Sequence, residues 1–226
     1  MEKVIILKET TKNPISLIGE RAGICWGADI SDPAKNYKRG LDCIQSGHGR
    51  TLEFVNVEMV FEGYSARVIR EWYTHIGCLP ARLQASTRYI DYKDFGYVTP
   101  HTIERNPEAK KIYDGIMAAI SDGCSKLEVL NIPREDSAMA LPLGMETKMV
   151  DKRNLRNLID MSRQRTCTRA FWEYRELFDD ICNALKDYSE EWKYLIETQM
   201  MPKCEMLGYC PEKRSCGRKP KKGKSA

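Results

Sequence analysis

The chain has 226 residues, of which 42% are hydrophobic and 30% are charged, so it is long enough to bury one sizeable core. Residues 212–226 hold seven basic side chains and one acid, which gives this tail a charge of +6. Because the net charge of the chain is +4, the remaining residues carry −2. A basic nucleic-acid surface over the whole body is therefore not indicated. No apolar run reaches the ~18 residues of a membrane helix, so no membrane partner is expected.

The first ten residues, MEKVIILKET, lack the long apolar core and the small-residue cleavage site of a signal peptide. Nine cysteines in a chain without such a signal favour reduced thiols. These two observations predict a cytoplasmic protein.

The first third of the chain predicts short strands and one clear helix. Residues 4–9 form an apolar run typical of a strand, and residues 10–30 suggest a packed loop or a short helix. A helix is expected from Pro33 to about Gln45, because Asp32 can cap it and proline suits its first position. Residues 52–62 alternate as in a half-buried strand, with the inward side chains Val55, Val57, Met59 and Phe61.

A Gly/Pro break at residues 77–80 separates two further elements. Before it, a helix over residues 66–76 is expected, with Val68, Trp72 and Ile76 on one stripe. After it, residues 81–92 are expected to be extended, because Pro80 prevents the helix from resuming.

The second half of the chain is mostly helical. A long helix is expected from Asn106 to about Leu130, interrupted near Gly123, with an apolar face of Ile112, Ile116, Ala119 and Ile120. A short helix at 133–141, a strand at 146–150 and helices at 152–165, 168–187 and 189–200 follow. The expected fold is α+β, with a mixed sheet and a largely helical C-terminal half. One catalytic domain over residues 1–201 precedes a basic, cysteine-containing tail over residues 202–226, which we expect to be partly disordered.

Common catalytic motifs are absent, including GxGxxG, the Walker loop, HExxH and GxSxG. Ser86 and Arg88 form the first candidate site, since they share one face of an extended segment. A hydroxyl beside a guanidinium suits a ring carbonyl, an imide or a phosphate. On the local pattern alone, an exposed surface pair without function is favoured.

Two further groups of residues are candidates. Arg156 and Arg163 lie seven positions apart on one predicted helix face, and Arg165 projects elsewhere. Such arginines could reach an inter-subunit cleft, although a solvated helix face is the simpler reading. The third group is Cys204, Cys210 and Cys216, which lack the paired spacing and the fourth ligand of a zinc site. Free, loosely ordered thiols are expected there, and no metal site is predicted.

Several segments between about residues 41 and 185 together resemble the flavin-dependent thymidylate synthase family, in the family's order. Its signature is Arg-His-Arg followed by Ser-x-Arg. Here Thr74-His75-Ile76 is followed by Ser86-Thr87-Arg88. Leu52-Glu53 resembles the family's Phe-Glu-His segment. The remaining matches are Pro133-Arg134-Glu135 with Leu141-Pro142-Leu143, Asn154-Leu155-Arg156-Asn157-Leu158, and Phe171-Trp172-Glu173-Tyr174-Arg175.

The resemblance implies a fold, a reaction and an assembly. The family forms homotetramers with an unusual α/β core that bind FAD at subunit interfaces. NAD(P)H reduces the flavin, and a methylene from methylenetetrahydrofolate and a hydride from the flavin are then placed on C5 of dUMP. By this resemblance the chain is expected to be an FAD-dependent methyltransferase of dTMP biosynthesis.

The resemblance also implies roles for individual residues. The expected flavin contacts are Glu53, His75, Asn154 and Arg156. The expected substrate-binding residues are Glu71, Gln84, Ser86, Arg88 and Arg165. Of these, Ser86 and Arg165 are the expected catalytic residues: Arg165 would stabilise charge on the uracil ring, and Ser86 would orient the base, because no general base is in sight to activate it.

The chain departs from the family pattern at identifiable positions. Thr74 and Ile76 replace both signature arginines, and two extra residues lie within residues 77–85, where Arg82 could replace a lost cation. Gln84 stands where the family has an acid and Glu71 where it has a glutamine. Ala138 aligns with an arginine that helps to hold the nucleotide phosphate.

These departures leave two alternatives to a thymidylate synthase. The first keeps the fold and the flavin but uses a different pyrimidine nucleotide or base. The second is a non-enzymatic protein that binds nucleic acid through the +6 tail. We expect nucleic acid to be the less favoured partner.

Overall fold

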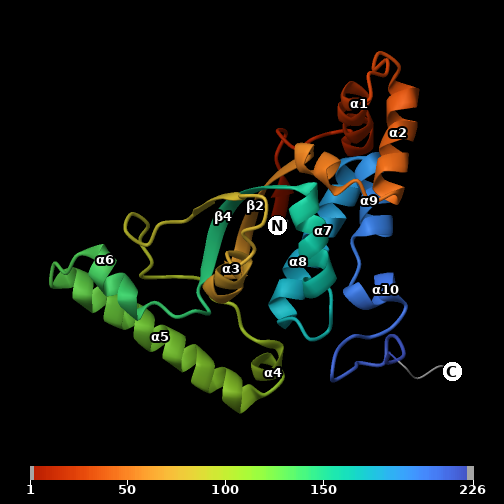
Figure 1. Ribbon diagram of the computed structural model, residues 1–226. Coiled ribbons are helices and arrows are strands. Elements are labelled where there is room, and N and C mark those ends of the chain that lie inside the picture. The colour runs from red at the N-terminus through yellow and green to blue at the C-terminus, as the bar shows by residue number, and fades with distance from the viewer. Residues whose placement is uncertain (1–2, 223–226) are drawn as a thin grey trace. The chain divides into compact units, whose positions relative to one another are not determined.

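The computed structural model describes residues 3–222, which divide into two compact units (Figure 1). Unit 1 comprises residues 61–74 and 82–150, and unit 2 comprises residues 3–60, 75–81 and 151–222. The expected division into a domain over residues 1–201 and a tail over residues 202–226 stays a prediction. Residues 223–226, part of the segment expected to be disordered, lie outside the described residues.

Four strands form one sheet in the order β1-β2-β4-β3, and β2 and β4 each contribute residues to both units. The strands are β1 (Val4–Ile6), β2 (Asn56–Ser65), β3 (Ala81–Gln84) and β4 (Glu146–Asn154). Ion pairs of Lys152 with Glu58 at 2.8 Å and of Lys148 with Glu62 at 2.9 Å mark the register of β2 and β4. The predicted α+β class is confirmed, and the sheet is antiparallel where a mixed one was expected.

Helices make up most of unit 2. They are α1 (Pro14–Cys25), α2 (Pro33–Gln45), the 3-10 helix η1 (Gly49–Phe54), α7 (Leu155–Arg165), α8 (Trp172–Tyr188), α9 (Glu190–Gln199) and α10 (Lys203–Leu207). Both predicted ends of α2 are confirmed, and Asp32 caps it by accepting hydrogen bonds from the backbone N–H groups of Ala34 and Lys35. Helices α1 and α2 approach so closely that a Cβ on Gly19 would lie 1.8 Å from the carbonyl oxygen of Asn36, which only glycine allows.

Unit 1 has a small core of Phe95, Met117 and Met145. Its helices are α3 (Ala66–Trp72), α4 (His101–Glu104), α5 (Pro107–Val129), α6 (Arg134–Ser137) and the 3-10 helix η2 (Ala138–Ala140). The predicted start of α5 is confirmed, and Asn106 caps the helix, with its Oδ1 accepting from two backbone N–H groups. The helix then passes through Gly123 without the expected break. Among residues 3–222, no helix combines the length and the apolar character needed to cross a membrane.

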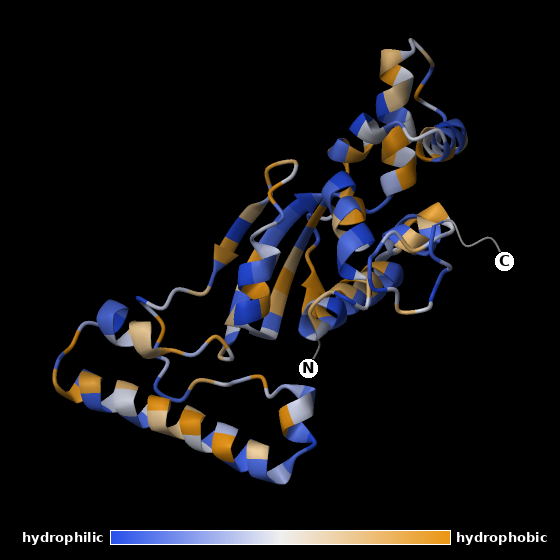
Figure 2. Ribbon diagram, turned by 60° about the horizontal axis from the view of Figure 1, so that its bottom comes forward, coloured by the Kyte–Doolittle hydropathy of each residue, from blue (hydrophilic) through white to orange (hydrophobic). Residues whose placement is uncertain are grey.

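The apolar face predicted for α5 is correct in pattern but wrong in burial. Ile112 is 65% exposed and Ile116 is 51% exposed, and Ala119 next to them on the same stripe is exposed too. Ile120, the fourth residue of the predicted face, is partly buried against the core, and Met117 and Cys124 of the same helix are buried. Apolar residues recur along the whole of α5 in Figure 2. An exposed apolar stripe of this kind marks an interaction surface.

Three predicted elements near the Gly/Pro break have bounds that differ from the expected ones. Residues 52–54 belong to η1, so the strand begins at Asn56. Helix α3 ends at Trp72, and Ile76, expected on its buried stripe, is 67% exposed. The extended segment ends at Gln84, because Ser86 begins a turn in which its carbonyl oxygen accepts the N–H of Ile90 at 3.1 Å.

Candidate functional site

The end of β4 and the start of α7 place the first group of predicted site residues, all within unit 2. Asn154 closes β4 and caps α7, since its Oδ1 accepts the backbone N–H of Asn157 at 3.0 Å. Two positions further on, the guanidinium of Arg156 donates from Nη1 to Oε1 of Glu53 at 2.5 Å. The hydrogen bond and the charge of Glu53 raise the pKa of Arg156. The structure therefore brings together Glu53 and Arg156, which are distant in sequence.

A cavity of about 230 Å³ lies beside this pair in unit 2. Its lining includes His48, Gly49, Arg156 and Arg163. Gly47, also in the lining, has a φ of +74°, so the chain turns sharply just before His48. Arginine donors beside glycine-rich backbone suit an anionic group that approaches the chain closely.

His75 and Arg165 form a second pair in unit 2. The Nε–H of Arg165 donates to Nε2 of His75 at 2.9 Å. The guanidinium carbon of Arg165 lies 4.5 Å from the centroid of the Tyr174 ring, and the His75 ring contacts the same tyrosine edge-to-face at 6.0 Å. Burial, followed by the charges of Arg165 and Arg153, lowers the pKa of His75 to about 4. His75 is therefore neutral at neutral pH, and with Nε2 accepting, the ring proton sits on Nδ1.

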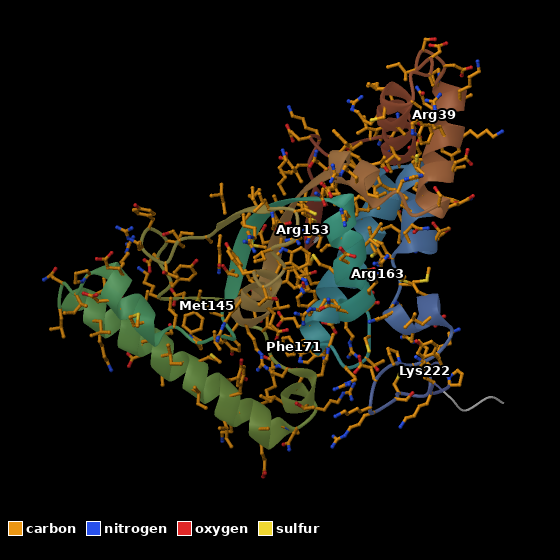
Figure 3. All side chains as sticks on the ribbon, viewed as in Figure 1. Arg39, Met145, Arg153, Arg163, Phe171 and Lys222 are labelled. Atoms are coloured by element: carbon orange, nitrogen blue, oxygen red, sulfur yellow. The ribbon has the colours of Figure 1, made fainter. Side chains whose placement is uncertain are left out.

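A buried ion pair behind these residues was not predicted from the sequence. Arg153 and Asp151 have fully buried side chains and are joined by two hydrogen bonds of 2.6 Å. Arg153 also donates from Nη1 to Oδ1 of Asn157 at 2.6 Å, which ties β4 to α7 near the label in Figure 3. The alternation of buried and exposed residues along the strand could have revealed this pair, because Asp151 and Arg153 lie on the same buried face as Met149. The expected strand stopped at Val150, one residue before Asp151 and three before Arg153.

The remaining predicted substrate residues lie in unit 1. Ser86 does not present a free hydroxyl on a strand face as expected, because its Oγ accepts the backbone N–H of Arg88 at 3.2 Å. Serine side chains commonly stabilise turns in this way. Arg88 itself donates from Nε to Glu135 at 3.0 Å.

Gln84 and Glu71 take different places in unit 1. Gln84, at the end of β3, donates from Nε2 to Oγ1 of Thr147 at 3.4 Å, so it is held against β4. Glu71 lies on α3, and its carbonyl oxygen accepts the hydroxyl of Thr74 at 2.7 Å.

Arg82 was considered as a replacement for a lost cation, and the structure gives it a local role. It donates from Nη1 to the carbonyl oxygen of Tyr73 at 2.8 Å, and its guanidinium lies 4.4 Å from the Tyr73 ring centroid. The loop before it contains two non-glycine residues with positive φ, Cys78 at 59° and Leu79 at 50°. Such backbone is costly for side-chain-bearing residues, and it lies in the segment with the two extra residues.

Two cysteines of the C-terminal segment are buried, since Cys204 and Cys210 are only 9% and 8% exposed. Within residues 3–222, no three histidine, cysteine or acidic side chains are grouped so as to hold a metal ion.

A family profile described as "Thymidylate synthase complementing protein" matches residues 6–189, most of the chain. The chain belongs to this family. Curated relatives named flavin-dependent thymidylate synthase include that of Nitratidesulfovibrio vulgaris, 29% identical over 208 residues that cover 86% of this chain and 82% of the relative. The relative from Geobacter sulfurreducens is 27% identical over 224 residues, covering 95% and 94% of the two chains.

Solved structures agree on the fold. The crystal structure of the flavin-dependent thymidylate synthase of Helicobacter pylori, complexed with FAD and dUMP, superposes with a TM-score of 0.69 at 20% identity. The match covers 88% of this chain and 99% of that one. The resemblance drawn from the ordered motifs is therefore confirmed at the level of family and fold.

Proposed function

We propose that this chain is a flavin-dependent thymidylate synthase, which methylates dUMP at C5 with methylenetetrahydrofolate as the carbon donor and NAD(P)H as the reductant. The family match over residues 6–189 carries this proposal. The alignments with relatives that bear this name cover nearly the full length of those relatives. No observation in the structure favours the nucleic-acid-binding alternative.

The residues of unit 2 fit the anionic part of FAD. Arg156 and Arg163 line the 230 Å³ cavity together with the backbone of residues 47–49, and a diphosphate needs such cationic and backbone donors. Ligand sites usually measure ~300–1,000 Å³, so this cavity would hold only part of the dinucleotide. We assign cofactor binding to Glu53, His75, Asn154 and Arg156. Bound there, the flavin would supply the hydride chemistry of the reaction.

Arg165 is the cation that we place at the uracil ring. Arg165 contacts neutral His75 through a hydrogen bond. A guanidinium held against Tyr174 and His75 is oriented before substrate arrives, and such preorganised donors stabilise negative charge as it develops. The role of His75 would then be to orient Arg165 as well as to meet the flavin, and it would stay unprotonated at working pH.

Gln84, Ser86, Arg88 and Glu71 are proposed to bind the nucleotide from unit 1. Ser86 would act through the turn that it stabilises, since its hydroxyl already accepts the N–H of Arg88. Arg88 is paired with Glu135, with both side chains more than half exposed. This exposed pair is weak in water, so a substrate phosphate could displace Glu135 from Arg88.

A different pyrimidine substrate remains the second candidate, and one local feature favours it. Ala138 stands where the family has a phosphate-binding arginine, and the nearby cavity of unit 1, lined by Ala138 and Arg134, measures only about 30 Å³. Arg134 is turned to the carbonyl oxygen of Tyr89 at 3.0 Å. Ranking pyrimidine nucleotides by thermal shift would decide, and dUMP as the clear best ligand would exclude this candidate.

We further propose a homotetramer. The exposed stripe of Ile112, Ile116 and Ala119 on α5 is apolar surface that a second copy would cover. The cavity that we assign to the flavin is too small for a whole dinucleotide, and a neighbouring subunit would supply the rest of the site. All nine cysteines are free, which supports a reducing, cytoplasmic location.

The deciding test combines a spectrum with an isotope assay. Purified protein should show a flavin absorbance band that shifts when dUMP is added. It should also release tritium from C5-labelled dUMP in the presence of methylenetetrahydrofolate and NADPH. Flavin-loaded protein that releases no tritium would refute the dUMP assignment, and protein that binds no flavin would refute both enzyme readings.

A further inference from the structure

A cavity of about 510 Å³ lies in unit 2 between the end of α7 and the segment after α9. Residues 163–170 form one side of it, and residues 202–204 and 210–219 form the other. The basic side chains in its lining are Arg163, Arg165, Arg169, Lys203, Arg214, Arg218 and Lys219. Glu212 is the one acidic residue in that lining.

Only part of this positive charge is neutralised locally. Arg169 pairs with Glu212, Lys219 pairs with Glu205 at 2.8 Å, and Arg163 pairs with Asp160 at 3.0 Å. No carboxylate within residues 3–222 forms an ion pair with Lys203, Arg214 or Arg218. Moreover, Nε of Arg163, which Figure 3 labels on α7, is buried without a hydrogen-bond partner in the described chain. Clustered like charges repel one another, so the cavity favours an anion.

The size and origin of the cavity narrow the choice of anion. Its volume is typical of a small-molecule site, and the cations converge on a hollow instead of following an extended surface, as a nucleic-acid backbone would require. Ten of its seventeen lining residues lie within residues 202–219, after the end of the family match at residue 189.

We propose that this cavity binds the multiply charged anionic part of a co-substrate, either an oligocarboxylate chain or an oligophosphate group. Both chemistries suit arginine and lysine donors. The inference rests on the proposed function. A folate co-substrate can carry an oligocarboxylate chain of linked glutamates, and NADPH carries an oligophosphate group. Arg165 lines the same cavity, so an anion bound there would lie beside the residue that we place at the uracil.

Cys216 offers a reporter of occupancy without any mutation. It is an exposed thiol in the cavity lining. A hydrogen bond with Thr168, together with the backbone N–H and the charge of Arg218, lowers its pKa, and a lower pKa favours the thiolate that alkylating reagents attack. Cys25 is also exposed but lies on α1, outside the lining, and serves as the internal control.

The test is calorimetric titration of the full-length flavoprotein at low salt with two probes, γ-linked pentaglutamate and inorganic tripolyphosphate. The probe that binds identifies the charge chemistry. The double variant Arg214→Gln, Arg218→Gln should bind it roughly a hundredfold more weakly, at about tenfold for each lost charge-assisted contact. The matched control, Lys38→Gln, Arg105→Gln, removes two charges from exposed positions outside the cavity and should bind within about twofold of the parent protein.

Iodoacetamide labelling gives the second measurement on unmodified protein. The bound probe should slow alkylation of Cys216 at least fivefold, as an order of magnitude for an occupied site, and leave Cys25 unchanged. The inference is overturned if neither probe binds, if both double variants lose binding equally, or if only a single-stranded oligonucleotide binds. Failure here in a protein that releases tritium from dUMP would leave the proposed function standing. Binding of a probe to a protein that releases none would separate the cavity from that function.

Discussion

Arg165 donates a hydrogen bond to His75 across 2.9 Å, although 90 positions separate the two residues in sequence. The contact joins the C-terminal end of α7 to the residues that follow α3. It exists only because His75 is neutral, since a protonated imidazole has no acceptor for the guanidinium. Both members of the pair are therefore sensitive to any change in the protonation of His75.

The first prediction concerns stability at acidic pH. The pKa of His75 is about 4 in the folded chain against an ordinary 6.5, so the unfolded chain binds the proton first as pH falls. Stability is present in full above pH 6.5 and is lost as pH falls from 6.5 through 4. The loss should be on the order of 1–2 kcal/mol, because solvent screens a half-buried ring. Urea unfolding at pH 7.5 and 4.5 measures it, and a His75→Gln variant with the same pH dependence as the parent would contradict it.

The second prediction separates the charge of Arg165 from its geometry. Arg165→Met removes the cation and should raise the pKa of His75, though not to 6.5, because burial is the larger cause and remains. Arg165→Lys keeps the charge but loses the Nε donor, so the pKa should stay low. Histidine ring NMR titration, assigned with His75→Gln, measures both. Under the proposed function both variants should lose about a hundredfold in kcat/KM. Equal pKa values in the two variants would show that charge is not the cause.

Much of this site could be foreseen from local sequence signals. The ordered motifs around Arg156 and Ser86 led to the correct family, and the cap of α2 at Asp32 was also recognised. Caps and alternation are readable because they depend on neighbouring residues. The hydrogen bonds of Arg165 with His75 and of Arg156 with Glu53 join residues 90 and 103 positions apart. The periodicity of helices and strands gives no information about contacts between residues so far apart in sequence.

Other features failed because tertiary context overrode a correct local pattern. Ser86 was expected on a strand, but its hydroxyl stabilises a turn instead. The apolar stripe of α5 was recognised, yet amphipathicity predicts burial without saying whether the same chain or a second one supplies the cover. Asp151 and Arg153 were overlooked because charged side chains are rarely found on a core face.

The third prediction uses that buried pair. Asp151→Asn or Arg153→Met should each reduce the free energy of unfolding by about 3–5 kcal/mol, because each leaves an uncompensated charge or donor in a site with no solvent access. The double variant should be less destabilised than the two single losses added together. The control is Asp160→Asn, which breaks the exposed contact with Arg163 and should cost less than about 1 kcal/mol. Urea unfolding followed by circular dichroism measures all four, and a loss at Asp151 no larger than at Asp160 would be inconsistent with the pair's burial.

The fourth prediction concerns the exposed stripe on α5. If a second copy covers it, Ile116→Glu should weaken association, because burial of one isoleucine contributes about 1.5–3 kcal/mol and a symmetric interface loses it twice. The dissociation constant should rise roughly a hundredfold or more. Ala118→Glu adds the same charge to the same helix at an exposed position off the stripe and should leave assembly unchanged. Sedimentation velocity over a range of concentrations distinguishes the two variants. An Ile116→Glu protein that sediments as the parent does would place the subunit interface elsewhere, and the stripe would then need another partner.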